Sequence, residues 1–409
     1  MKPHKFIPLL LIAAGLLAYH NSFQGPFIFD DLDSIRDNPH IRHLWPLTEP
    51  MITSPKLAVQ GRPVECLTLA LNYAWDGLNV RGYHAFNLAL HLASALVLFG
   101  VLRRTFESER LHARFATPAP WLAAAIALIW EVHPLQTESV TYIVQRSELL
   151  MGLFLLLTLY CFIRGVESQD WPRGSAALRR GVEGSGSAGA PISESGLTSP
   201  SHEEERGAED ERGSAGASPS KTQRIGWGQP TLHPTRLGTA DATPASDRLG
   251  QPTLHRARIG WFCLSVVSCL LGMGSKEVMV GAPLIVLLYD RVFLASSFRE
   301  LWQRRGGLYI GLAATWLLLA LLVAGATHDA ARFGIKGLTS WGYLTTEAGV
   351  ILYYLRLCFW PHPLVIDYAD WPIASSWQDV LVSGVVILGL LGATVWEFRR
   401  RPWLGFLGA

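Results

Sequence analysis

Two adjacent carboxylates, Asp30 and Asp31, are the residues of this chain best suited to catalysis, because they closely follow an apolar segment. At a membrane–water boundary, neighbouring carboxyl groups repel each other in a medium of reduced dielectric constant, which can hold one of them near its protonation balance. Such a group can act as the general base that takes the proton of a hydroxyl. A solvated acidic turn, a helix N-cap and a pair of hard-cation ligands remain alternative roles.

Three cationic residues near the ends of apolar segments are candidates for binding a phosphate group: Arg62, Arg146 and Lys276. Ionisable groups at membrane depth are costly and therefore often mark a functional site. Polar residues of the neighbouring loops complete a candidate substrate site, and these are His84, His133, Glu138, Glu277 and Asp367. Pairing and snorkelling at a helix end would also explain Lys276 and Glu277, and His84 also suits a hydrogen-bonded histidine inside a helix bundle.

Other kinds of chemistry find little support in the sequence. The five cysteines show no CxxC spacing, and the histidines form no HExxH motif, so no zinc site is predicted. With 35 basic and 33 acidic residues, the chain has no one-sided basic stripe. Nucleic acid is therefore not an expected partner.

Apolar helices must position these residues. The 409 residues are 49% hydrophobic and only 17% charged, and the mean hydropathy is +0.23, which is too apolar for a soluble protein of this length. A spanning helix needs about 20 mainly apolar residues. The windows that reach or approach this length are 6–19, 83–102, 121–132, 149–163, 259–272, 278–294, 308–324 and 380–396. The sequence thus predicts an all-α polytopic membrane protein with about eight or more transmembrane helices.

Short loops rich in arginine stay on the cytoplasmic side, and such clusters occur at 103–114, 291–305 and 399–401. The predicted outer segments are then 21–82, 133–147, 273–277 and 327–378. Residues 345–360 are apolar enough to span, but a span there would put the last arginine cluster outside. We therefore predict an interfacial amphipathic helix at 345–360, and another at 62–78.

Residues 165–257 are rich in Gly, Ser, Ala, Pro, Glu and Arg, and the string GQPTLH occurs twice, at 228–233 and 250–255. So polar a segment cannot bury enough apolar surface to offset the entropy lost on ordering. We predict a disordered cytoplasmic insertion without a catalytic role. It separates the first half of a membrane domain, 1–164, from the second half, 258–409, which we expect to be truncated.

Four ordered motifs resemble the membrane domain of the large GT-C glycosyltransferases. They are FDDLDSIRDNPHIRHLW from Phe29, GRPV from Gly61 with GYHAFNLALH from Gly82, HPLQTESVTYIVQRSE from His133, and GSKE from Gly274. Within that superfamily the chain is most similar to the tetratricopeptide-repeat-linked protein O-mannosyltransferases and their bacterial counterparts. The fold that the resemblance implies is a GT-C-like helix bundle with interfacial helices on the outer face.

The resemblance also implies an activity. In such families the acidic pair of the first outer loop carries the catalytic base, which falls here on Asp30 and Asp31. The donor is a polyprenyl-phosphate-linked sugar, here mannose or another hexose, and the acceptor is a hydroxyl, of protein Ser/Thr or of a glycan. A lipid phosphate leaves without the acid that glycosidases need, so one base and cations for the phosphate suffice for an inverting displacement. No cofactor is implied, although a divalent metal stays an alternative for the pair.

The expected location is a bacterial inner membrane, with the site facing the periplasm or exterior. The family's repeat domain does not follow the predicted spans, which leaves acceptor recruitment open. A transporter would show broken or charged spans and an inverted repeat, neither of which is clear. A non-catalytic membrane anchor of a repeat-containing assembly protein would explain the spans, but not four polar motifs in the family's order. The sequence therefore favours an inverting glycosyltransferase.

Overall fold

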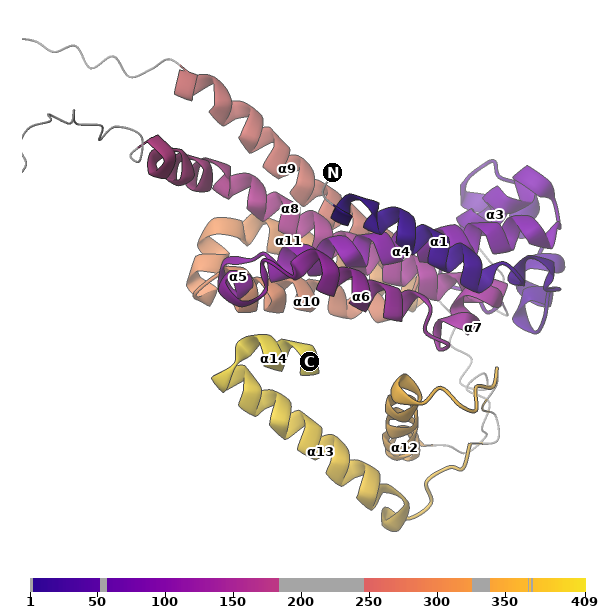
Figure 1. Ribbon diagram of the computed structural model, residues 1–409. Helices are drawn as coiled ribbons and strands as arrows, with labels where there is room; N and C mark the ends of the chain where they lie inside the picture. Colours follow the sequence, from indigo (N-terminus) through magenta and orange to yellow (C-terminus); the bar gives the residue numbers. More distant parts are fainter. Residues whose placement is uncertain (1–2, 52–56, 184–245, 326–338, 367, 369–370) are drawn as a thin grey trace, which may run out of the picture. The chain divides into compact units, whose positions relative to one another are not determined.

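The computed structural model describes residues 3–51, 57–183, 246–325, 339–366, 368 and 371–409. Every regular element in this part of the chain is helical, and Figure 1 shows no strand among them. The contacts divide the chain into two units, Met1–Asp170 with Pro252–Ala409, and Trp171–Gln251. The predicted all-α class is confirmed.

The α-helices are α1 (Ile7–Tyr19), α2 (Thr48–Met51), α3 (Pro63–Asp76), α4 (Val80–Phe106), α5 (Glu109–Phe115), α6 (Ala119–Glu131), α7 (Gln136–Thr141), α8 (Arg146–Glu183), α9 (Ser246–Met273), α10 (Ala282–Tyr289), α11 (Phe298–Gly325), α12 (Ser340–Phe359), α13 (Trp377–Arg400) and α14 (Pro402–Gly408).

Five helical segments of the described chain are long and apolar enough to cross a membrane, and a sixth span arises if the bent pair α5 and α6 counts as one. The five are Val80–Phe106, Ile143–Ser168, Arg256–Met273, Phe298–Gly325 and Trp377–Arg400. The polytopic membrane fold agrees with the sequence prediction, whereas the count of about eight is not reached in this part of the chain.

Two of the predicted windows fall short for identifiable reasons. Helix α1 has 13 residues, so it rises about 20 Å at 1.5 Å per residue, against a hydrocarbon core of about 30 Å. The window 278–294 is broken into a 3₁₀ segment, Glu277–Gly281, the short helix α10, and a π segment, Asp290–Leu294. Pro283 at the start of α10 lacks the amide hydrogen that a continuous helix would need.

Helix α4 is central to the packing. It contacts α1 and α6, as Figure 1 shows, and small residues of α6 such as Ala123 and Ala127 are buried against Leu11 and Phe99. A second apolar cluster joins α4 to α8, α9, α10 and α11, and it includes the fully buried Phe162 of α8. These two clusters hold the helices whose ends carry the candidate site.

The loops at one end of these helices have a small core of their own. Ile35 and Ile41 from the loop after α1 pack with Cys66 and Leu69 of α3 and with Ile143 at the start of the next span. All five of these side chains are fully buried. The first and second predicted outer segments are therefore packed together, which gives the residues between them fixed positions.

Local sequence explains where α3 and α4 begin. Pro63 occupies the first turn of α3, where its missing amide hydrogen costs nothing. Helix α3 ends at Gly77, whose φ of +59° favours glycine. The side chain of Asn79 then accepts a hydrogen bond from the backbone amide of Arg81 and caps the start of α4. Arg62 thus lies directly before α3, and Tyr83 lies in the first turn of α4.

The predicted insertion, 165–257, is described only at its edges. Helix α8 continues to Glu183 and α9 begins at Ser246, so helical backbone enters this segment from both sides. Residues 184–245 lie outside the described residues, and the disorder and lack of a role predicted for the segment stay predictions. The predicted interfacial segments correspond to α3 and α12, and neither is among the candidate spans.

Candidate active site

Asp31 lies at the start of the acidic loop and is 1% exposed. One carboxylate oxygen accepts a hydrogen bond from the backbone amide of Val144 (2.8 Å), and the other accepts one from the amide of Ile28 (3.2 Å). Burial raises the pKa of Asp31 to about 6, against the opposite effect of these amides, and the neighbouring charge of Asp30 adds to the rise. Asp31 therefore joins the first predicted outer segment to the second.

Asp30 differs from its neighbour because its side chain is exposed. Its backbone amide donates to the hydroxyl of Tyr142 at 3.0 Å, and the Tyr142 ring meets the Phe29 ring edge-on, with centroids 6.4 Å apart. Phe29 has a φ of +44°, the only positive φ found in a non-glycine residue of the described chain. Such strain persists only where the surroundings hold it and is common at functional sites. The backbone thus turns sharply just before the acidic pair and presents Asp30 outward.

Arg146, at the start of α8, is fully buried. Its guanidinium donates to the side-chain oxygen of Asn87 (2.7 Å) and to the carbonyl oxygens of Thr68 (3.2 Å) and Tyr83 (3.2 Å). It also lies over the ring of Phe86, 4.5 Å from the centroid. The structure therefore places this predicted phosphate ligand inside the protein, where its donors tie α3 and α4 to α8.

The two other predicted phosphate ligands lie closer to the surface. Arg62 is 20% exposed, donates to the Ser147 hydroxyl (3.3 Å), and has Glu277 at 3.8 Å. Lys276 is 15% exposed and binds the carboxylate of Glu148 at the start of α8. The backbone of Gly274 accepts a hydrogen bond from Val64 at 3.0 Å, which holds the third predicted outer segment against α3. Arg62, Lys276 and Glu277 are thus brought together.

Glu65 adds a carboxylate to this group. It is fully buried one turn after Arg62, whose nearest guanidinium nitrogen is 3.8 Å away. In the described residues neither of its oxygens makes a hydrogen bond of ordinary geometry, although the backbone amide of Ser147 lies near enough to act against the rise of its pKa. Burial raises the pKa of Glu65 to about 8, although the charges of Arg62, Arg146 and Lys276 act in the opposite direction. Glu65 therefore shares the environment of all three predicted phosphate ligands.

A cavity of about 470 Å³ opens beside this group. One part of its wall is polar, with Gln136, Glu138, Gln145 and Glu148, and another is apolar, with Trp130, Leu149 and Met151. Tyr354 of α12 completes the wall. The cavity thus offers both an apolar surface and polar groups, the combination that a lipid-linked polar ligand requires.

The remaining predicted site residues are distributed unevenly. Glu138 lines the cavity and accepts a hydrogen bond from Gln145 (3.2 Å); partial burial and the charge of Glu148 raise its pKa. His84 is buried in α4 and its Nε2 contacts the carbonyl oxygen of Gly25 at 3.0 Å. His133 contacts the carbonyl oxygen of Cys358 at 3.1 Å. Asp367 lies outside the described residues.

Sequence reasoning did not single out Glu65, Asn87, Tyr142 or Glu148 as site residues. Glu65 carried a usable signal, because it is a charged residue three positions after Arg62 on an amphipathic helix. The roles of Asn87 and Tyr142 depend on contacts across 59 and 112 residues of chain, which no local pattern contains. As for metal binding, no group of three or more His, Cys, Asp or Glu side chains in the described residues is arranged to hold an ion.

The fold and the site define a class: an all-α, polytopic membrane protein with an acidic pair and cationic residues on loops packed at one end of its helices. Comparison with known proteins shows which members of this class the chain resembles. Protein O-mannosyl-transferase Tmtc3 of Drosophila melanogaster is 31% identical over 182 residues, which are 40% of this chain and 20% of that relative.

Two human proteins give the same result. Protein O-mannosyl-transferase TMTC4 is 30% identical over 177 residues, covering 39% of the chain and 23% of the relative. Protein O-mannosyl-transferase TMTC1 is 33% identical over 167 residues, covering 39% and 18%. The chain therefore spans about a fifth of the length of these relatives. No protein-family profile and no solved structure matches it. The predicted resemblance to protein O-mannosyltransferases is confirmed.

Proposed function

We propose that the chain is an inverting glycosyltransferase that moves a hexose, mannose by similarity, from a polyprenyl-phosphate donor to a hydroxyl of a protein acceptor. The support is the similarity to proteins named protein O-mannosyl-transferases, together with a site whose groups suit this chemistry. The similar region is a fifth of those proteins, so the site chemistry has to carry the rest of the argument.

One observation carries the proposal: a single short segment, Tyr142–Glu148, contacts every part of the site. The Tyr142 hydroxyl and the Val144 amide bind the acidic pair, and Gln145 and Glu148 line the cavity. Glu148 also holds Lys276. The acidic pair, the cations and the cavity are therefore positioned by one element, as a reaction between a bound donor and an acceptor requires.

We assign different roles to the two aspartates. A general base must reach the hydroxyl proton that it removes, and only Asp30 is exposed. Asp31 has both oxygens bound to backbone amides, so it is a positioning residue that fixes the loop. In the proposed step the acceptor oxygen bonds to the anomeric carbon as its proton passes to Asp30. The bond from that carbon to the phosphate oxygen breaks, and its electron pair leaves with the polyprenyl phosphate.

The cations would stabilise the leaving phosphate. Arg62 and Lys276 are partly exposed. Lys276 binds Glu148 of the cavity wall, and Arg62 donates to Ser147, the residue before Glu148 in the chain. Positioned positive charges are worth most where new negative charge develops. Arg146 supports them from inside, because it holds the start of α8 and shares the electrostatic environment of Glu65. We therefore assign Arg146 to positioning, and we keep Arg62 and Lys276 as the proposed phosphate contacts.

We further propose that this end of the helices faces the outside of the cell, in a bacterial inner membrane. The support is the arginine clusters, which favour the cytoplasmic side. Three of the predicted outer segments meet at the site. Two of the arginine-rich segments meet elsewhere, where Arg110 donates a hydrogen bond to the carbonyl oxygen of Ala295 at 2.6 Å. A cysteine introduced at Asp33 should react with an impermeant thiol reagent added outside, and one at Ser214 should not.

The experiment that tests the proposal is transfer of label from a radiolabelled polyprenyl-phosphate mannose to an acceptor peptide by the chain reconstituted in lipid nanodiscs. Transfer that depends on Asp30 supports the proposal. Labelled lipid recovered unchanged in every condition, from a sample whose thermal unfolding shows that it is folded, would contradict it.

A further inference from the structure

A second cavity lies away from the candidate site, between α9 and α11. Its volume is about 470 Å³. The two helices run side by side here, because the Cys269 sulfur lies 3.3 Å from the Thr315 hydroxyl, and a Cβ at Gly311 would lie 3.1 Å from Val266. From Arg258 in the cavity wall to the end of α9 the helix rises roughly 22 Å. Arg258 and the loop that carries Lys276 therefore lie at opposite ends of the apolar span Arg256–Met273.

The wall of this cavity is divided by polarity. Three arginines, Arg258, Arg304 and Arg305, form its basic part. The rest is apolar or small and comes from both helices: Ile259, Phe262, Cys263, Val266, Val267, Gly307 and Leu308. Two of the apolar wall residues of α9 are also partly exposed, Ile259 at 47% and Val267 at 48%. A ligand here would need an anionic group and a hydrocarbon part.

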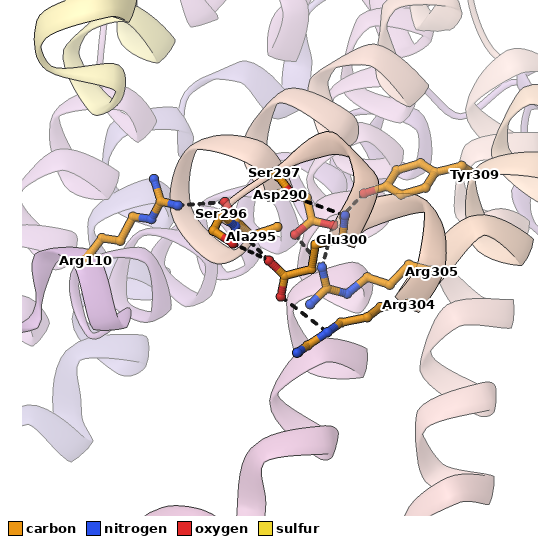
Figure 2. A network of polar contacts seen from close by, with 9 residues as sticks. All are labelled: Arg110, Asp290, Ala295, Ser296, Ser297, Glu300, Arg304, Arg305 and Tyr309. Carbon is orange, nitrogen blue, oxygen red and sulfur yellow. Dashed lines mark hydrogen bonds and ion pairs between the residues drawn. The ribbon is translucent and has the colours of Figure 1, made fainter.

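Arg305 shows that this basic wall is built into the fold. It is only 6% exposed, and its guanidinium holds both oxygens of the buried Asp290 at 2.7 Å, while Tyr309 donates to the same carboxylate at 2.6 Å (Figure 2). Helix α11 is kinked at Arg305. In the described part of the chain its Nε has no hydrogen-bond partner. An orphaned donor on a buried cation that lines a cavity is a position where an anion gains a charge-assisted hydrogen bond.

The second arginine of α11 is held as well. Arg304 pairs with Glu300 one turn earlier at 3.3 Å, and Glu300 accepts hydrogen bonds from Ser296, as Figure 2 shows. Arg304 is still 55% exposed, so it can share its donors with a ligand. Basic cavities between transmembrane helices are the sites that anionic lipid headgroups occupy.

We propose that the cavity between α9 and α11 binds an anionic glycerophospholipid, with its phosphate on Arg258, Arg304 and the Nε of Arg305 and an acyl chain along Phe262, Val266 and Leu308. The charge of the wall selects an anionic over a zwitterionic headgroup. Its apolar part selects a lipid over a free phosphate. The site does not depend on the proposed transferase activity, since Arg258 lies at the other end of the span Arg256–Met273 from the loop of Lys276.

The test uses the purified full chain after delipidation, with phosphatidylglycerol as the probe and phosphatidylethanolamine as the comparison, and native mass spectrometry as the readout. We expect a retained phosphatidylglycerol adduct and a weaker phosphatidylethanolamine adduct. The double variant Arg258→Gln/Arg304→Gln should weaken phosphatidylglycerol binding by about 30-fold, which is about 2 kcal/mol, from two charges at about 1 kcal/mol each.

Two further variants make the result specific. Arg299→Gln removes one positive charge from the same end of α11 at a residue that does not line the cavity, and it should leave binding unchanged. Gly307→Leu fills the cavity without loss of charge. A Cβ there meets no atom within 4 Å, so this variant should fold and lose the adduct even if the double arginine variant does not fold. Equal retention of phosphatidylglycerol in Gly307→Leu and the parent would overturn the proposal, and so would equal retention of phosphatidylglycerol and phosphatidylethanolamine by the parent.

Discussion

Exchanging each aspartate of the acidic pair for asparagine separates the proposed base from the proposed positioning residue. Asp30 is exposed, so Asp30→Asn should leave thermal unfolding unchanged while it reduces transfer by about 10²–10⁴-fold, the range for loss of a general base. Asp33→Asn is the matched control, because Asp33 is an exposed carboxylate of the same loop and should keep nearly full activity.

Asp31→Asn should behave differently. Burial raises the pKa of Asp31 from 3.8 to about 6, which means that the ionised carboxylate is disfavoured in the fold by about 3 kcal/mol at neutral pH. A group whose folded pKa is raised in this way stabilises the protein at low pH and loses that contribution as pH rises from about 4 to about 6. Asparagine carries no charge but can accept from only one of the two backbone amides, and the hydrogen bond that it loses costs about 1–3 kcal/mol. This loss largely offsets the gain from removing a buried charge, so at pH 7.5 the variant should unfold within a few degrees of the parent. Its activity should fall only about tenfold, through a less well fixed loop.

The assay is label transfer at saturating donor, with unfolding followed in the same detergent. Our reasoning is refuted if Asp30→Asn keeps full activity, or if Asp31→Asn alone loses 10²-fold or more. Either result would move the base to the buried residue. A large drop in unfolding temperature for Asp31→Asn would show instead that its ionised form is well stabilised.

Three more predictions follow from the site. Arg146→Leu should destabilise the fold by about 3–5 kcal/mol, because it leaves buried partners of a charged group unsatisfied. The control Arg103→Gln, at an exposed ion pair, should lower the free energy of unfolding by less than about 1 kcal/mol. Equal effects of the two variants in thermal unfolding would contradict the positioning role of Arg146. Lys276→Gln should raise the donor concentration that gives half-maximal rate by about 10- to 100-fold, because one charged hydrogen-bonding group is lost. An unchanged concentration would remove Lys276 from the phosphate contacts. The rate of transfer by the parent should fall as the pH drops through about 6, because Asp31 becomes protonated there. The variant Asp31→Asn should show a flatter pH profile in this range. An identical profile in the variant would assign the pH dependence to another group.

The sequence predicted those features that depend on composition and on residues close along the chain. Apolar windows such as 83–102 and 308–324 correspond to α4 and α11, because about 20 apolar residues have few alternatives to a spanning helix. The turn Ser275–Lys276–Glu277 was recognisable as polar between two apolar segments. The windows at 6–19 and 278–294 were less predictable, since hydropathy does not register a helix that ends early or changes its hydrogen-bonding pattern.

The candidate site was predictable as a set of residues and not as an arrangement. Asp30 and Asp31 have the same residue type and adjacent positions, yet one is exposed and the other is bound by two backbone amides. The difference arises from Val144, which lies 113 residues away in the chain. Arg146 is a second example, because its position at a helix end predicts a cation that is accessible to solvent. Long-range packing against Asn87 and Phe86 buries it instead.

The most direct test of the proposed glycosyltransferase determines the stereochemistry of the transfer and whether the transfer requires an acceptor hydroxyl and Asp30. The reconstituted chain is supplied with polyprenyl-phosphate mannose of defined anomeric configuration and a Ser/Thr peptide, and the anomer of the glycopeptide is determined. We predict label on the peptide with inverted configuration and none on a peptide whose Ser and Thr are replaced by Ala. With Asp30→Asn we predict transfer that is slower by about 10²–10⁴-fold. Retained configuration, or transfer that is equal with Asp30→Asn, would contradict the proposed mechanism.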